Sequence, residues 1–199
     1  MTMLSGGWPN GAVIQAVFAY VLIAGFFGLE ILLRRGAAAR SVEATDSDKG
    51  STRLIGVAFA VALILPPILN RLRLGVVAGV GVRWLGLIIM VLGLGLRVWS
   101  MRVLGEYYSR TLRVGDAQEI VTRGPYRIVR HPGYTGTLLL WIGSGLALGN
   151  WIAAAAIAAL MLGIFSYRIR SEESMLLMTF GQRYQLYRQH TWTLVPFVY

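Results

Sequence analysis

Cysteine is absent from the 199 residues, and histidine occurs only at His131 and His190. Without cysteine the chain can form no disulfide, no zinc site with thiolate ligands and no cysteine nucleophile. Two histidines are too few for a site in which several histidines bind a metal. We therefore expect no metal in this protein.

Charged residues are also few. They make up 14% of the chain, compared with about 25% in a typical soluble domain. Hydrophobic residues make up 56%, and they form long blocks instead of recurring at amphipathic spacing. The net charge of +10 comes from arginines that flank these blocks, so membrane topology explains it better than nucleic-acid binding. The composition predicts an integral membrane protein.

Long apolar runs predict an all-α, polytopic membrane fold with about five transmembrane helices. A helix needs about 20 residues to cross a hydrocarbon core. The first run is expected to be a retained helix, because no Lys or Arg precedes it as in a signal peptide. The last apolar tract, residues 134–167, would be roughly 50 Å long as one helix, so we expect it to fold back at Gly149-Asn150. The five expected spans are residues 11–33, 54–69, 84–101, 134–148 and 151–167.

Polar stretches divide the chain into three parts. The first three helices occupy residues 1–101, in which residues 34–53 are expected to be a solvated loop. Residues 102–133 mix charges with tyrosines and aliphatic residues, which indicates an ordered segment at the membrane interface. Residues 134–199 hold the helical hairpin and, over 168–190, an amphipathic cytoplasmic C-terminal helix near the membrane.

The loop charges favour one orientation. Leaving out Arg97 because it lies within a span, the loops 34–53, 102–133 and 168–190 carry 15 Lys and Arg, and the opposite side carries 3. The positive-inside rule then places the N-terminus outside and these three loops in the cytoplasm. The compact plan, without a eukaryotic type of targeting element, suggests a prokaryotic inner membrane.

Glycines within the third expected span have a structural explanation. Gly93 and Gly95 lie in the middle of the apolar run, and small residues allow membrane helices to approach closely. We expect both glycines to face another helix.

Two polar clusters flank the expected hairpin. The cluster from Arg130 to Gly136 precedes the fourth span, and the cluster from Arg168 to Glu173 follows the fifth. Because a hairpin returns the chain to the same membrane face, the clusters should be neighbours. The adjacent carboxylates of Glu172 and Glu173 suit a ligand that offers hydroxyls and a positive charge, and S-adenosylmethionine offers both. Backbone amides exposed where the helix starts could hold the carboxylate of such a ligand.

Simpler roles also fit these residues. Arg130 and Arg168 suit arginines that reach the lipid headgroups and only set the topology. Glu172 and Glu173 suit a solvated helix turn paired with nearby arginines. His131 by itself is typical of a histidine with a structural hydrogen bond.

Several motifs occur in an order that resembles one enzyme family. Gly124-Pro125-Tyr126 is followed by Arg130-His131-Pro132-x-Tyr134-x-Gly136, then by Glu172-Glu173, and then by Phe180-Gly181-x-x-Tyr184-x-x-Tyr187. This arrangement, over residues 97–199, resembles the isoprenylcysteine carboxyl methyltransferase family and the related phospholipid N-methyltransferases. A lone Arg-His-Pro would not be specific, whereas these motifs in order, at a spacing set by one hairpin, are.

The resemblance implies S-adenosylmethionine as the cofactor, S-adenosylhomocysteine as its product, and no metal or covalent intermediate. It implies that Arg130 is the catalytic residue that orients the nucleophile of the acceptor, and Arg168 is a second candidate for binding the acceptor. In-line transfer of a methyl group needs mainly proximity and alignment. The residues that would contact the cofactor are Pro125, Tyr126, Arg127, Ile128, His131, Tyr134, Gly136, Glu172 and Glu173.

The expected function is methyl transfer from S-adenosylmethionine at the cytoplasmic face to a lipophilic acceptor that enters from the bilayer. An arginine beside the transferred methyl favours an anionic nucleophile, such as the carboxylate of an isoprenylcysteine or of another lipid acid. A phospholipid amine and a thiol are the alternative acceptors. A membrane reductase of the sterol-reductase type and a non-catalytic membrane scaffold are the alternatives from other classes.

Overall fold

The computed structural model describes residues 10–32, 50–77, 79–105 and 120–197. Helices joined by turns make up these residues, and no strand occurs among them. The helices are α1 (Asn10–Leu32), α3 (Ser51–Arg71), α4 (Val80–Leu104), the short 3-10 helix η3 (Gly124–Arg127), α5 (Pro132–Ala147), α6 (Trp151–Phe180) and α7 (Gln182–Gln189).

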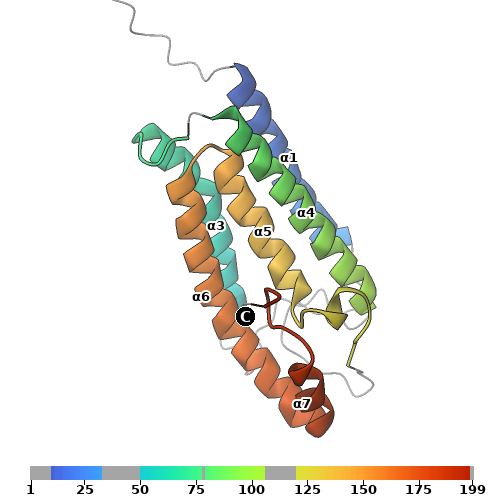
Figure 1. Cartoon of the computed structure of the whole chain (residues 1–199). Coiled ribbons are helices and arrows are strands. Elements are labelled where there is room, and N and C mark those ends of the chain that lie inside the picture. The colour runs from blue at the N-terminus through green and yellow to red at the C-terminus, as the bar shows by residue number, and fades with distance from the viewer. Residues whose placement is uncertain (1–9, 33–49, 78, 106–119, 198–199) are drawn as a thin grey trace, which may run out of the picture.

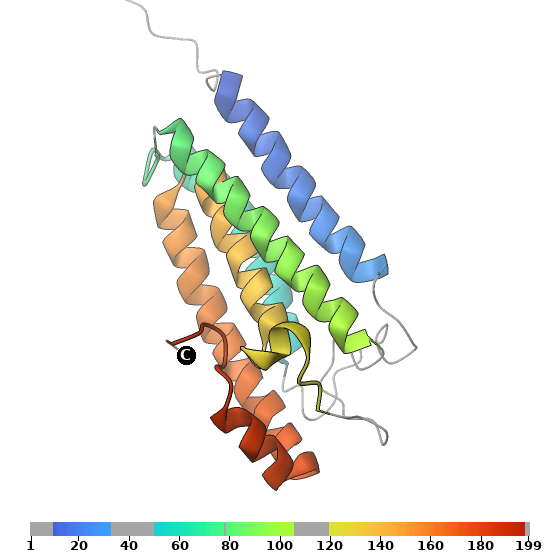
Figure 2. The same ribbon diagram turned by 45° about the vertical axis from the view of Figure 1, so that its right-hand side comes forward.

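The long helices pack as one bundle with α5 in its middle (Figures 1 and 2). α5 lies between α4 and α6, α3 packs on α6, and α1 lies on the outer side of α4. Trp141 of α5 is fully buried in the core. Its ring stacks on Phe59 of α3 at a centroid distance of 5.1 Å and meets Phe26 of α1 edge-on. These aromatic contacts join helices from both halves of the chain.

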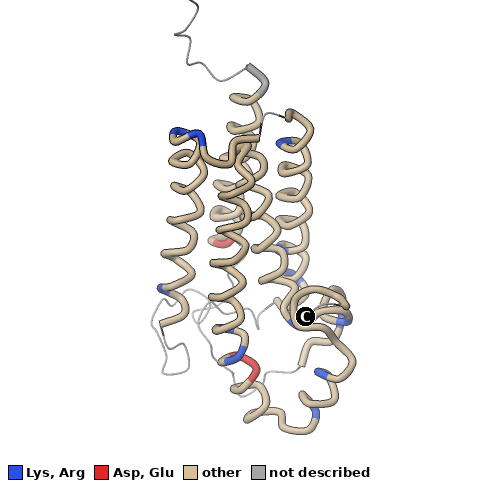
Figure 3. Tube along the Cα trace, turned by 60° about the vertical axis from the view of Figure 1, so that its left-hand side comes forward, with Lys and Arg blue, Asp and Glu red and all other residues tan. Residues whose placement is uncertain are grey.

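The bundle has the exterior of a membrane protein. Four of the described helices, α1, α3, α4 and α6, are long and apolar enough to cross a membrane, while α5 has 16 residues. Aliphatic side chains such as Val57, Ile64, Val91 and Leu92 are exposed, as expected for a surface that meets lipid. Lys and Arg lie mainly toward the ends of the bundle (Figure 3). The predicted all-helical membrane fold is confirmed.

Glycines allow α4 and α5 to cross closely. A Cβ atom on Gly93 would lie 2.6 Å from the Gly136 carbonyl oxygen, and one on Gly143 would lie 2.7 Å from the Gly86 carbonyl oxygen. No side chain fits at such distances, so each glycine lets two backbones touch. The predicted packing role is confirmed for Gly93 but wrong for Gly95, because a Cβ on Gly95 would meet nothing within 4 Å.

Three helices are longer than the sequence predicted. α4 runs from Val80 to Leu104 instead of over residues 84–101. α3 passes through Pro66 and Pro67 and ends only at Arg71, because neighbouring groups in a membrane bundle can compensate for the hydrogen bonds that proline removes. α6 continues without a break from Trp151 to Phe180. The separate helix expected over 168–190 is therefore the end of α6 followed by the short α7.

Turns fall where glycine permits them. Gly149 and Asn150 separate α5 from α6, as predicted. Gly181, with a φ of 51°, separates α6 from α7. Residues 34–49 of the expected solvated loop, and residues 106–119 of the expected interfacial segment, lie outside the described residues.

Candidate functional site at the start of the helical hairpin

The site begins at the turn into α5. Pro132 is the first residue of α5, where its missing N–H removes no helical hydrogen bond. His131 precedes it in a non-helical conformation, with a φ of −125° and a ψ of 55°. Tyr134 follows in the first helical turn, and its ring stacks on His131 at 5.7 Å. The local sequence thus places both rings at the mouth of the hairpin.

Glu173 of α6 faces this turn and binds three side chains. Arg130 Nε donates to Glu173 Oε1 over 2.7 Å, and His131 Nε2 lies 3.3 Å from the same oxygen. Arg188 Nε of α7 lies 3.3 Å from Glu173 Oε2. The side chains of Arg130 and Glu173 are only 8% and 11% exposed. Both carboxylate oxygens of Glu173 are therefore engaged inside the protein.

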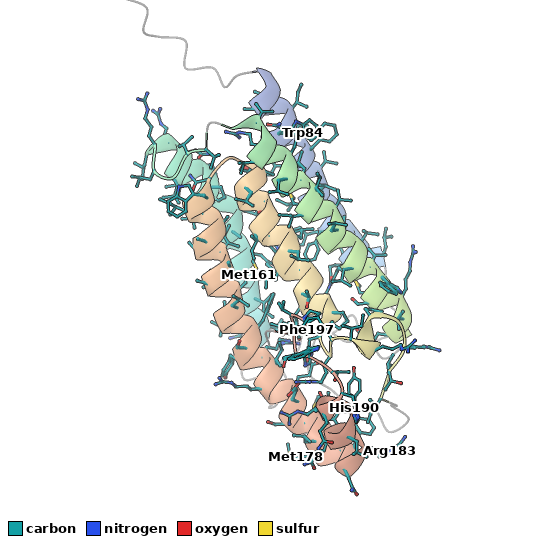
Figure 4. The ribbon with its side chains drawn as sticks, in the orientation of Figure 1. Trp84, Met161, Met178, Arg183, His190 and Phe197 are labelled. Atoms are coloured by element: carbon teal, nitrogen blue, oxygen red, sulfur yellow. The ribbon has the colours of Figure 1, made fainter. Side chains whose placement is uncertain are left out.

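Arg130 also holds the C-terminal segment in place. Its Nη1 donates to the carbonyl oxygens of Arg188 and Thr191, and its Nη2 donates to Thr193 Oγ1 over 2.8 Å. The Arg130 N–H donates to the Trp192 carbonyl over 2.7 Å. In Figure 4, His190 and Phe197 mark this segment, which runs from α7 back towards α5. With the bond from Nε to Glu173, the guanidinium donates four hydrogen bonds, and it has five N–H donors.

Glu172 belongs to a second, more open group. Tyr134 donates its hydroxyl to Glu172 Oε2 over 3.0 Å, and Arg168 Nε donates to the Tyr134 hydroxyl over 2.7 Å. Arg168 also donates to Ser51 Oγ over 2.8 Å and to Thr52 Oγ1 over 3.1 Å. The Glu172 side chain is 28% exposed. Of the two glutamates, Glu172 therefore has the more exposed side chain.

The short helix η3 forms another edge of the site. Pro125 is buried, while Arg127 and Ile128 are exposed. Tyr187 of α7 donates its hydroxyl to the Tyr126 carbonyl over 2.7 Å. Burial raises the pKa of the Tyr187 hydroxyl, so this group keeps the proton that it donates. The contact joins η3 to α7 below the hairpin.

Most of the residues expected at the site lie together. Arg130, His131 and Tyr134 of the first cluster meet Arg168, Glu172 and Glu173 of the second, as the hairpin predicted. Gly136 lies apart from them, at the crossing with α4. Contacts with a cofactor stay predictions for all of these residues.

Arg97 was given no functional role in the sequence analysis. Its Nη2 lies 2.7 Å from Glu30 Oε1, which joins α4 to α1. Its Nη1 borders the α5 turn, only 2.7 Å from the position of a Cβ on Gly133. An ionisable residue within an apolar span is itself a signal of function, and that signal was available in the sequence.

Tyr184 of α7 is a further buried group beside the site. It is only 2% exposed, and its hydroxyl has no hydrogen-bond partner among the described residues. Burial raises its pKa, and the charges of Glu173 and Glu172 act in the same direction. A buried hydroxyl normally finds a partner, so Tyr184 is a candidate to contact a ligand. Nothing in the sequence beyond the family motif singled it out.

The arrangement suits a small polar ligand at the membrane surface. Glu172 offers carboxylate acceptors, Arg130 and Arg168 offer donors, and the His131 and Tyr134 rings offer flat surfaces. The part of the chain that the structure describes contains no group of three or more His, Asp or Glu that could hold a metal ion. Together, the apolar bundle and the polar cluster at the start of its last hairpin define a membrane protein with a candidate ligand site at one end of the bundle.

Comparison with known proteins identifies the family. The model of the isoprenylcysteine carboxyl methyltransferase (ICMT) family matches residues 84–178. Protein-S-isoprenylcysteine O-methyltransferase B of Arabidopsis thaliana is 30% identical over 154 residues, which cover 74% of this chain and 78% of that protein. The chain belongs to the isoprenylcysteine carboxyl methyltransferase family, which confirms the resemblance seen in the sequence.

Two further relatives agree. A probable protein-S-isoprenylcysteine O-methyltransferase of Oryza sativa subsp. indica is 31% identical over 119 residues, which cover 59% of this chain and 62% of that protein. The solved structure of a eukaryotic intramembrane Ras methyltransferase, an isoprenylcysteine carboxyl methyltransferase, matches with a TM-score of 0.64 and 27% identity, over 92% of this chain and 64% of that one. The chain thus spans less than two thirds of either relative. These relatives are eukaryotic and give no support to the expected prokaryotic type.

Proposed function

We propose that this protein transfers a methyl group from S-adenosylmethionine to a lipophilic acceptor at the membrane interface. The observation that carries the proposal is the meeting of Arg130 and His131 with Glu172 and Glu173 across the hairpin, in a chain of this family. Its named relatives are isoprenylcysteine O-methyltransferases. The reductase and scaffold alternatives gain no support from these comparisons.

The residues of the site fit the proposed cofactor. S-adenosylmethionine, when bound, supplies a methyl group on a sulfonium. The Glu172 carboxylate can accept hydrogen bonds from ribose hydroxyls and stabilise positive charge. Its side chain is exposed enough for a ligand to reach it. His131 and Tyr134 stack on each other beside it. Arg168 and Tyr134 fix the Glu172 carboxylate in one orientation.

A carboxylate is the acceptor that the charges favour. A fixed positive charge stabilises an anionic nucleophile, but a neutral amine becomes cationic as it reacts and is disfavoured there. Arg130 keeps one N–H donor beyond its four internal hydrogen bonds, and this donor would orient the acceptor. An isoprenylcysteine carboxylate fits both this charge and the names of the relatives.

We also propose that α5 is a fifth crossing, that the N-terminus lies outside, and that the site faces the cytoplasm. The motivation is the place of α5 between α4 and α6 and the excess of arginine on the side of the site. Because the chain has no cysteine, single variants Arg73→Cys and Arg183→Cys can be labelled in intact cells with an impermeant maleimide. Labelling of Arg73→Cys alone is expected, and labelling of Arg183→Cys alone would overturn the orientation.

Two measurements test the catalytic proposal. Calorimetry with S-adenosylhomocysteine and detergent-purified protein should show binding that Glu172→Gln weakens and that the matched surface variant Arg183→Gln leaves unchanged. Incubation with labelled S-adenosylmethionine and farnesylcysteine should yield a base-labile methyl ester. Absence of cofactor binding by well-folded protein would refute methyl transfer, and a base-stable product would show that the amine of farnesylcysteine is methylated instead of the carboxylate.

A further inference from the structure

An apolar groove lies between α1 and α4, on the opposite side of α4 from α5. Its volume is about 570 Å³, and it is lined by side chains such as Leu22 and Leu29 of α1 and Val91 and Val98 of α4. Both helices are candidate membrane spans, and Val91 is 55% exposed. The groove therefore opens towards the hydrocarbon of the bilayer.

The groove ends at an aromatic residue and a cation. Trp99 and Arg102 line it in the last turns of α4, Trp99 is 53% exposed, and Arg102 is exposed. Tryptophan and arginine are the side chains that anchor a helix at the boundary between hydrocarbon and headgroups. The apolar part of the groove thus lies at the depth of acyl chains, and Arg102 lies at the depth of phosphates.

The same end of α4 carries more positive charge. The short helix η3 packs there, because a Cβ on Gly124 would lie 3.0 Å from Val103 and 3.5 Å from Trp99 Nε1. This turn brings two further exposed arginines, Arg123 and Arg127. Arginines clustered at the membrane surface attract anionic lipid, and guanidinium groups bind phosphate through paired hydrogen bonds.

We propose that the groove between α1 and α4 is a binding site for an anionic phospholipid. One acyl chain lies along Leu22, Leu29, Val91 and Val98, and the phosphate lies at Arg102, with Arg123 and Arg127 adding attraction. The bound lipid covers both helices. α1 packs mainly against α4, so the lipid stabilises this contact beside the Glu30–Arg97 ion pair. This site does not depend on the proposed methyl transfer.

Gly95 provides a clean way to block the groove. It lines the groove, and a Cβ there would meet nothing within 4 Å, so the side chain of Gly95→Phe starts from open space and extends into the groove. Gly56 of α3 is an equally exposed helical glycine with nothing within 4 Å, away from the groove. Gly56→Phe is therefore the matched control, and Val91→Trp is a second blocking variant.

Native mass spectrometry of the full chain, with phosphatidylglycerol and phosphatidylcholine of identical acyl chains, tests the proposal. Phosphatidylglycerol should bind about fivefold more tightly or better, the factor expected for one basic side chain at an anionic lipid. Arg102→Gln should remove about that factor and leave phosphatidylcholine binding unchanged. Gly95→Phe and Val91→Trp should abolish the preference, whereas Gly56→Phe should keep it.

Three outcomes would overturn the lipid site. Equal binding of the two phospholipids by the wild type would show that the arginines do not select an anionic lipid. Unchanged phosphatidylglycerol binding in both folded blocking variants would place the lipid elsewhere. Displacement of phosphatidylglycerol by farnesylcysteine, with loss of both in Gly95→Phe, would make the groove the site of the methyl acceptor.

Discussion

Arg130 donates its Nε hydrogen to Glu173 Oε1 over 2.7 Å, although 43 residues separate the two along the chain. This ion pair joins the turn before α5 to the far part of α6, and it is almost fully buried. Through the other hydrogen bonds of Arg130 it also holds the C-terminal segment against the site. The pair thus organises three separate segments of the chain.

Glu173→Gln should destabilise the protein strongly. The substitution keeps the size of the side chain but leaves Arg130 and Arg188 without their carboxylate, and breaking a buried ion pair from one side costs about 3–5 kcal/mol. Thermal unfolding in detergent measures this as a large drop in midpoint. Arg127→Gln, on the exposed surface of η3, is the control and should unfold like the wild type, and a wild-type midpoint for Glu173→Gln would contradict the structural role of the pair.

Glu172→Gln should act on ligand binding instead of stability. The Glu172 carboxylate is partly exposed, so solvent screens its charge, and neutralising it costs less than neutralising the buried Glu173. Loss of a hydrogen bond to a charged group costs about 1.5 kcal/mol or more, which corresponds to roughly tenfold weaker binding of S-adenosylhomocysteine in calorimetry. Affinity equal to the wild type, or a stability loss as large as that of Glu173→Gln, would show that the two glutamates do not differ as the structure indicates.

Tyr134→Phe should lower catalytic efficiency while the protein stays folded. The hydroxyl accepts from Arg168 and donates to Glu172, so its removal breaks this link and leaves the Glu172 carboxylate less well oriented. We expect kcat/KM for farnesylcysteine to fall about tenfold, in keeping with roughly 1.5 kcal/mol for a hydrogen bond to a charged group. Tyr20→Phe, on an exposed face of α1, should leave this rate unchanged. A full rate for Tyr134→Phe would show that the Arg168–Tyr134–Glu172 link is not needed.

Gly93→Ala and Gly95→Ala should have opposite effects on stability. A Cβ on Gly93 meets α5 backbone at 2.6 Å, whereas a Cβ on Gly95 meets nothing. Overpacking typically costs about 1–3 kcal/mol, while alanine at an open helical position is favoured by up to about 1 kcal/mol over glycine. Unfolding midpoints of the two variants should therefore move down and up, respectively, and a shared direction would contradict the close crossing of α4 and α5.

The sequence predicted the hairpin and the meeting of the two polar clusters because these depend on local features. The tract over 134–167 is too long to cross a membrane once, and Gly149-Asn150 is the natural place for a turn, so the polar clusters at its ends had to meet. The different surroundings of Glu172 and Glu173 could not be predicted in this way. Adjacent residues on a helix point in different directions, and only the packing of α5 and α7 decides which one is buried.

The C-terminal segment was the largest omission. Trp192 and Thr193 form backbone hydrogen bonds with residues 128–131, and the Thr193 hydroxyl accepts from Arg130, but no periodicity or charge pattern marks this segment. Arg97 received no role for another reason. The loop charges were used only to find the orientation, and Arg97 was left out of that count because it lies within a span. In the structure it pairs with Glu30 and joins α1 to α4.

The amino-acid sequence by itself determined that the chain is an all-helical membrane protein, because long apolar runs can be buried only in lipid or in a helical core. It also determined the family motifs and the turn that brings them together. Tertiary structure alone decided which of the paired groups is buried, which glycines touch another backbone, and where grooves remain. These features depend on distances between helices, which are fixed only when all side chains pack at once.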